Sequence, residues 1–295
     1  MTDLISILVS TIVLGSIYGL VAIGMSLIYG ILRVLDMSQG SMVLIGGYVG
    51  WAVMTNSGLS PVLALVLAFL VTLALGVTTQ LVSVQPLIGR RGVDFEMITF
   101  ITTFAVAMVL SNLSLQIFGP QSRYVPSVIS GEVKIYNGVS LSYQSALMAG
   151  CSIAIMVGLG LWIARSRWGV ALRAVAQDTD AARLMGVPVK RMFPIVMGLA
   201  SSLAGVAGVF LAAQYFASPT AGDQPLLIAL IVVIFAGLGS LSGTIYAAYL
   251  IALVEATSST LIGTTWSLPI MYGVILVVLL IRPQGLRGRQ VEARL

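Results

Sequence analysis

Long apolar runs, separated by short polar segments, recur along the whole chain and constrain its fold more than any other feature. A helix needs roughly 20 apolar residues to cross the hydrocarbon core of a bilayer. By that measure the sequence predicts spans at about 4–31, 41–56, 60–84, 97–118, 144–164, 193–213, 225–256 and 267–282. Spans of this kind are helical, because backbone polar groups find no water inside a membrane. We therefore expect an all-α, polytopic membrane bundle that forms a single domain over residues 1–295.

The composition excludes several other classes of protein. Only 8% of the residues are charged, whereas soluble domains carry about 25% charged residues. The chain has no histidine and a single cysteine, Cys151, and no spacing typical of metal ligands, so we expect no metal site and no enzyme activity. The net charge of +5 does not indicate nucleic-acid binding, because the basic residues lie beside apolar spans, where they set orientation in the membrane.

The distribution of basic residues predicts that orientation. Three segments are rich in Lys or Arg: 85–96, 165–192 and the C-terminal tail, with Arg90, Arg91, Arg165, Arg167, Arg173, Arg183, Lys190, Arg191, Arg282, Arg287, Arg289 and Arg294. Under the positive-inside rule these segments are cytoplasmic. The loop 119–143 and the segment 214–224 carry few basic residues and are expected outside, together with the N-terminus.

The glycine-rich stretch GLGSLSG, at 237–243, interrupts the seventh span. If residues 225–256 crossed the membrane only once, the arginine-rich tail would end outside, against the positive-inside rule. The sequence therefore predicts two half-length helices that meet at Gly237–Gly243. Non-helical backbone at membrane depth needs protein or a water-filled cavity around it. This gives about nine membrane segments, with eight to ten possible because some segments can be broken or re-entrant.

The polar segment 165–192 is helix-capable and stands out from its apolar surroundings. Asp178 or Asp180 can cap the N-terminus of a short helix, and Gly186 suits its C-terminal end. Leu184 and Met185 then project from this helix with little of the chain to cover them. Such an apolar tip indicates either a docking element for another protein or a helix that lies in the lipid headgroup layer.

Several runs resemble the permease subunits of branched-chain amino acid ABC importers, and most closely the smaller of their two permease types. They are GLVAIGMSLIYG (19–30), DMSQGSM (36–42), GGY (46–48), WGVALRAVAQD (168–178), GVPV (186–189), LASSLAGVAG (199–208) and IRPQGL (281–286). The resemblance implies a bacterial inner-membrane location, a second permease, homologous or identical, two ATPase subunits and a periplasmic substrate-binding protein. It also implies that the 165–192 loop couples to the ATPase through Gly169, Arg173, Asp178, Ala182, Arg183, Leu184, Met185 and Gly186.

The chain departs from this family after its first span. The family's pattern reads Asn-Phe-Ala-His-Gly followed by an acid, whereas this chain has Asp36-Met-Ser-Gln-Gly40 followed by Ser41. If this segment lines the translocation path, the substrate can differ from leucine, isoleucine or valine. Urea, amides and small organic acids, which relatives of the family carry, are the alternatives.

The sequence has no nucleotide-binding loop of its own. A P-loop requires Gly-x4-Gly-Lys-Ser/Thr, and neither lysine of the chain, Lys134 or Lys190, follows a glycine. We therefore expect no cofactor on this chain, with ATP and Mg²⁺ used by the partner ATPase subunits.

Polar residues at membrane depth are candidates for the translocation path, because they are costly to expose to lipid. The candidates are Ser38, Gln39, Gly40, Thr99, Thr102, Thr103 and Glu255. Hydroxyl groups can instead bond back to their own helix, and Glu255 can lie in water at the interface. An ion-coupled secondary transporter remains an alternative, although it predicts paired buried ionisable groups and Glu255 is the only deep acid expected here.

Overall fold

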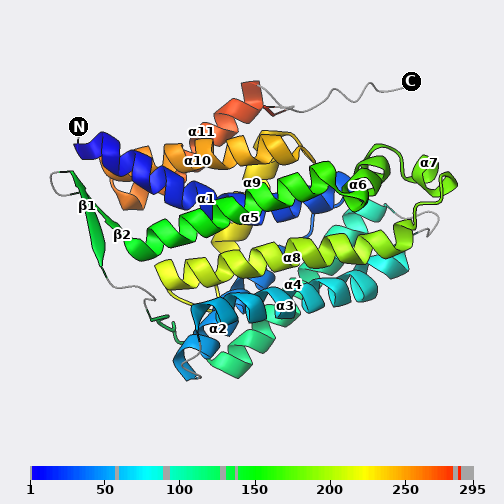
Figure 1. The fold of residues 1–295 in the computed structure, drawn as a ribbon, viewed down its shortest axis with the longest axis horizontal. Coiled ribbons are helices and arrows are strands. Elements are labelled where there is room, and N and C mark those ends of the chain that lie inside the picture. Colours follow the sequence, from blue (N-terminus) through cyan, green and yellow to red (C-terminus); the bar gives the residue numbers. More distant parts are fainter. Residues whose placement is uncertain are drawn as a thin grey trace.

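The computed structural model describes residues 2–56, 60–88, 94–126, 131–136, 139–281 and 285–286. These residues form a helical bundle (Figure 1). Six of its helices are long and apolar enough to cross a membrane. They are α1 (Thr2–Leu32), α3 (Pro61–Thr79) with the irregular turns η1 (Gln80–Val84) and η2 (Gln85–Leu87) that continue it, α4 (Phe95–Phe118), α5 (Tyr143–Arg165), α8 (Val189–Gln214) and α10 (Leu241–Leu261).

Three further helices complete the bundle within the described residues: α2 (Gln39–Asn56), α9 (Asp223–Ala236) and α11 (Thr264–Ile281). These nine helices correspond one to one with the nine predicted segments, and six of them are long and apolar enough to cross a membrane. Their bounds lie close to the predicted spans, because each span is a continuous apolar run and ends where polar or turn-forming residues begin.

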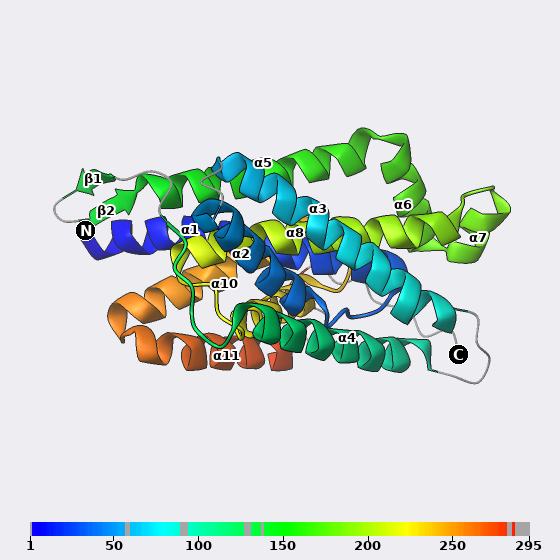
Figure 2. The same cartoon turned by 90° about the horizontal axis from the view of Figure 1, so that it is seen from below.

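The two ends of the bundle differ (Figure 2). At one end, which we call the hairpin end, the start of α1 lies beside the antiparallel strands β1 (Glu132–Tyr136) and β2 (Val139–Ser142). The sequence predicted only a loop over 119–143, so this hairpin is a correction. At the opposite end, the α7 end, α6 (Arg167–Gln177) and α7 (Thr179–Leu184) project from the bundle. Arg90, Arg91 and the four tail arginines lie outside the described residues.

Helix α8 is the centre of the bundle and packs against α1, α2 and α3. Small residues are concentrated in its middle, from Ala200 to Gly208, which allows helix backbones to approach closely. A Cβ atom at Gly46 of α2 would lie 2.0 Å from the carbonyl oxygen of Gly205, and one at Gly208 would lie 2.0 Å from the carbonyl oxygen of Val43. The α2–α8 contact is therefore backbone against backbone, and only glycine fits these positions.

Helix α2 begins in the interior of the bundle, and the start of α9 meets it. After α1 the chain turns at Arg33, whose φ is 59°, and α2 begins at Gln39. After α8 the chain returns inward, and α9 begins at Asp223. The two starts touch, since a Cβ atom at Gly222 would lie 2.0 Å from the carbonyl oxygen of Gly40. We call this the Gly40–Gly222 contact; from it α2 runs toward the hairpin end (Figure 2).

The predicted interruption at Gly237–Gly243 is present, but the prediction of two half-length helices is wrong for one of them. Helix α9 has 14 residues, whereas α10 has 21 and is long enough to cross a membrane. Gly237 and Gly239 adopt φ values of 92° and 82°, which glycine tolerates. Gly239 packs on Gly30, near the end of α1. The interruption is thus a tight turn between α9 and α10. The non-helical segment that meets the start of α2 lies earlier in the chain, before α9.

Candidate functional site

Helix α7 is a short, exposed helix at the outer edge of the α7 end (Figure 1). Both caps predicted from the sequence are present. The carboxylate of Asp178 accepts hydrogen bonds from the backbone N–H groups of Asp180 and Ala181, each at 2.9 Å, which satisfies first-turn donors that have no partner in the helix. Gly186 follows the last turn with a φ of 83°. Local sequence is therefore sufficient to start and end this helix.

The apolar tip of α7 is exposed, as predicted. Leu184 is 90% exposed and Met185 is 85% exposed. Arg183 forms an ion pair with Asp180 across one turn, at 3.5 Å, and the pair is open to solvent. Two large apolar side chains thus extend beyond the bundle beside a charged rim, and none of the described residues covers them.

Other residues predicted to couple to the ATPase have contacts inside this chain. Gly169 is buried, and a Cβ atom there would clash with the carbonyl of Ile163. Arg173 donates hydrogen bonds to the carbonyl oxygens of Ile163 and Ala164 in the last turn of α5. Ala182 is buried within the loop. Gly169 and Arg173 thus hold α6 onto the end of α5, and α7 packs against α6 and α8, which fixes the position of the exposed tip.

The path candidates Ser38 and Gln39 surround a buried carboxylate, Asp36, that sequence reasoning did not select. One oxygen of Asp36 accepts from the backbone N–H of Ser38 at 2.9 Å and from its hydroxyl at 2.7 Å. The other accepts from Nε2 of Gln39 at 3.2 Å. Asp36 thereby stabilises the start of α2 inside the bundle. The pattern Asp-x-Ser before an apolar helix is a capping signal that could have identified this residue.

We expect Asp36→Ala to destabilise the protein substantially. The substitution leaves three buried donors without an acceptor, at a cost of about 1–3 kcal/mol for each. Asp94→Ala is the matched control, because Asp94 caps α4 from an exposed position with one 3.4 Å hydrogen bond. Thermal unfolding of both variants in detergent tests this, and equal losses of stability would contradict the assignment.

The threonines of α4 divide between two environments. Thr103 accepts a hydrogen bond from the backbone N–H of Met37 at 3.2 Å, so it joins the segment around Asp36. Thr99 is buried one turn away, and its hydroxyl has no partner among the described residues. Thr102 bonds back to the carbonyl of Thr99, at 3.1 Å. Gly40 forms the Gly40–Gly222 contact, so four of the path candidates, Ser38, Gln39, Gly40 and Thr103, lie at or beside the start of α2.

Glu255 lies apart from that group, in a cavity of about 460 Å³ toward the hairpin end. It is 8% exposed, and its Oε1 accepts a hydrogen bond from the hydroxyl of Tyr18 at 3.3 Å. Glu255 is therefore buried inside the bundle, and its place in the translocation path stays a prediction. Tyr18 was not selected from the sequence, because 237 residues separate the two and no local signal links them.

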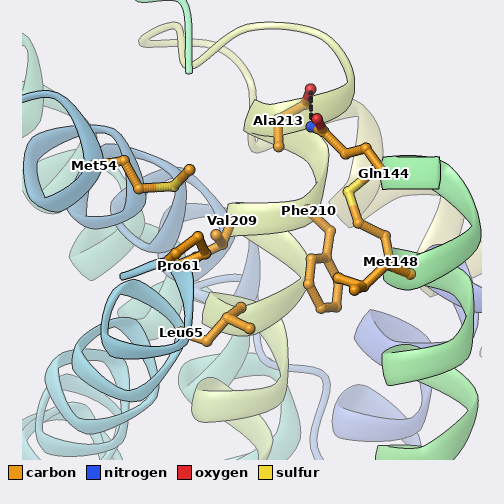
Figure 3. Close-up of a pocket in the computed structure, with 9 residues that line it drawn as sticks. Met54, Pro61, Leu65, Gln144, Met148, Val209, Phe210 and Ala213 are labelled. Carbon is orange, nitrogen blue, oxygen red and sulfur yellow. Dashed lines mark hydrogen bonds between the residues drawn. The ribbon is translucent and has the colours of Figure 1, made fainter. Parts of the chain in front are cut away.

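A smaller cavity of about 40 Å³ lies between α2, α3, α5 and α8 (Figure 3). Its one polar side chain, Gln144, donates a hydrogen bond to the carbonyl of Ala213 at 3.1 Å. The remaining lining residues are apolar: Met54, Pro61, Leu65, Leu147, Met148, Val209, Phe210 and Ala213. This cavity therefore offers a polar substrate no free partner.

The sequence matches known permeases over almost its whole length. Residues 7–281 match the family model described as "Branched-chain amino acid transport system / permease component". The chain is 29% identical to the high-affinity branched-chain amino acid transport system permease protein BraD of Pseudomonas aeruginosa, over 96% of this chain and 95% of BraD. It is 26% identical to the corresponding protein LivH of Escherichia coli K12, over 94% and 93% of the two chains.

The fold also matches a solved structure. A chain of PsaBC from Streptococcus pneumoniae, in complex with Fab, superposes with a TM-score of 0.51, at 15% identity, over 96% of this chain and 93% of that one. At this identity the match concerns the fold alone. The family model, however, covers most of the chain. This multi-pass membrane protein therefore belongs to the family of permease components of branched-chain amino acid transport systems.

Proposed function

We propose that this chain is the membrane-spanning subunit of an ATP-driven importer that carries branched-chain or related small amino acids across the bacterial inner membrane. BraD and LivH, which are named as branched-chain amino acid permeases, support this substrate class. The observation that carries the proposal is the exposed tip of α7, where Leu184 and Met185 lie uncovered on a helix whose position is fixed from within the chain. An apolar pair held in this way suits a groove on another subunit.

The motor is a separate chain in this proposal. The sequence contains no P-loop, so two partner ATPase subunits bind ATP and Mg²⁺, and this chain binds no cofactor. A second permease completes the membrane part, and a periplasmic binding protein delivers substrate. The α7 end faces the cytoplasm, because Arg165, Arg167, Arg183, Lys190 and Arg191 gather there, and the N-terminus lies outside.

Purification and reconstitution test this proposal. The tagged chain, expressed with the genes adjacent to its own, is expected to retain an ATPase in mild detergent. Proteoliposomes of that complex, supplied with the binding protein and ATP, are expected to accumulate leucine, isoleucine or valine. Uptake of urea, amides or organic acids alone would overturn the substrate class. Uptake driven by an ion gradient, without any ATPase, would overturn the importer assignment.

A further inference from the structure

The cavity at Glu255 is large enough for a small organic molecule. Helices α1, α8, α9, α10 and α11 contribute to its wall, and its volume of about 460 Å³ lies within the roughly 300–1,000 Å³ typical of ligand sites. Part of the lining is apolar and includes Leu14, Leu211, Pro225 and Leu268. The polar part includes Tyr18, Gln224, Glu255, Ser259 and Ser267. An amphipathic ligand would find both kinds of surface here.

Glu255 is only half satisfied by the protein. Its Oε1 accepts from Tyr18, whereas its Oε2 is buried and has no hydrogen-bond partner among the described residues. The lining residues of the cavity include no lysine or arginine. A buried acid at membrane depth is costly without a partner of opposite charge or a donor. A molecule inside the cavity can supply the missing donor, because Glu255 lines that cavity.

The first turn of α9 lines the same cavity through Gln224 and Pro225. Gly222 precedes that turn and provides no side-chain cap. The N-terminus of a helix carries partial positive charge, which favours an anion. In this turn the N–H of Asp223 donates to the carbonyl of Thr220 at 3.2 Å and Pro225 has no N–H, which leaves the N–H of Gln224 for an anion. Asp223 belongs to the same turn but is not among the residues that line the cavity. The cavity thus combines a negative side chain with the positive end of a helix.

We propose that this cavity binds the substrate itself, as an amino acid zwitterion with an apolar side chain. The substrate ammonium group donates to Oε2 of Glu255, its carboxylate lies toward the start of α9, and its side chain contacts the apolar wall. The proposal rests on the proposed function and deepens it, because Glu255 makes the permease itself select for an ammonium group. Organic acids without an amine are then rejected by the carboxylate.

Ligand binding to the purified full-length protein tests the site directly. Three probes are used. Leucine has both charged groups, 3-methylbutylamine has the ammonium group and the apolar side chain but no carboxylate, and 2-hydroxy-4-methylpentanoate has the carboxylate but no ammonium group. Leucine and the amine are expected to raise the thermal unfolding midpoint, and the hydroxy acid is not. Glu255→Gln is expected to weaken binding of both amines roughly tenfold to a hundredfold, because a charged hydrogen bond is lost.

Two further variants separate binding from folding. Glu96→Gln removes an exposed acid of α4 and is expected to leave both affinities unchanged. Tyr18→Phe keeps the carboxylate of Glu255 but removes the hydroxyl that donates to it, so we expect the affinities for both amines to change a few-fold. This variant tests the site even if Glu255→Gln proves unstable. The site is overturned if neither amine binds the wild-type protein, if Glu255→Gln binds them equally well, or if the hydroxy acid binds as tightly as leucine. Amine binding without ATP-driven uptake would instead refute the proposed function and retain the site.

Discussion

Replacing both Leu184 and Met185 by aspartate is expected to abolish ATP-driven uptake while the permease still folds and inserts. The two side chains are 90% and 85% exposed, so the substitution removes no packing within this chain. In an interface they would be buried, where central contacts contribute about 2 kcal/mol or more each. Two buried carboxylates would add a desolvation cost. We therefore expect at least a hundredfold loss of ATPase binding.

The measurement is the amount of ATPase that co-purifies, together with substrate uptake in proteoliposomes. Asp180→Asn is the matched control, since it changes a charge on the same helix at a side chain that is 90% exposed. Exposed ion pairs contribute about 1 kcal/mol at most, so this variant is expected to keep nearly full activity. Normal uptake by the double aspartate variant would mean that α7 does not contact the motor.

Gly46→Leu is expected to prevent the bundle from assembling. Even a single Cβ atom at this position would lie 2.0 Å from the carbonyl oxygen of Gly205. The obstacle is backbone, which cannot rotate away as a side chain could, so α2 and α8 would have to separate. Overpacking costs about 1–3 kcal/mol in adaptable cores and occasionally more. Separation of these two helices would also disturb the Gly40–Gly222 contact.

Gly158→Leu, in α5, provides the comparison. A Cβ atom at Gly158 would meet nothing within 4 Å, so the larger side chain has open space. We expect Gly158→Leu to elute as a single species in size-exclusion chromatography with a wild-type unfolding midpoint, and Gly46→Leu to aggregate or unfold at a much lower temperature. Equal behaviour of the two variants would show that the α2–α8 contact is not essential.

The parts of the fold that depend on local sequence were predictable. The end at Gly186 was assigned correctly, and the N-cap was narrowed to Asp178 or Asp180, of which the structure shows Asp178, because caps depend on a few neighbouring residues. The membrane spans were predictable too, since each consists of a continuous apolar run. The exposure of Leu184 followed from the shortness of the capped helix, and no residue of the described part of the chain covers it.

Features that depend on distant residues were not predictable. The length of α10 was underestimated because a glycine-rich interruption gives no indication of its depth in the membrane. The start of α2 gave no sign that Asp36 is fully buried, since burial depends on how the helices around it pack. The pairing of Tyr18 with Glu255 joins α1 to α10 and arises only from packing.

Two segments far apart in the sequence, the start of α2 and the start of α9, meet at the Gly40–Gly222 contact. Helix α2 runs from this contact toward the hairpin end, and α9 starts at the contact as a separate helix. Neither of these helices continues past the contact. Because both positions are glycine, the two chain segments meet through backbone alone, and a larger residue at either position would force the starts of the two helices apart.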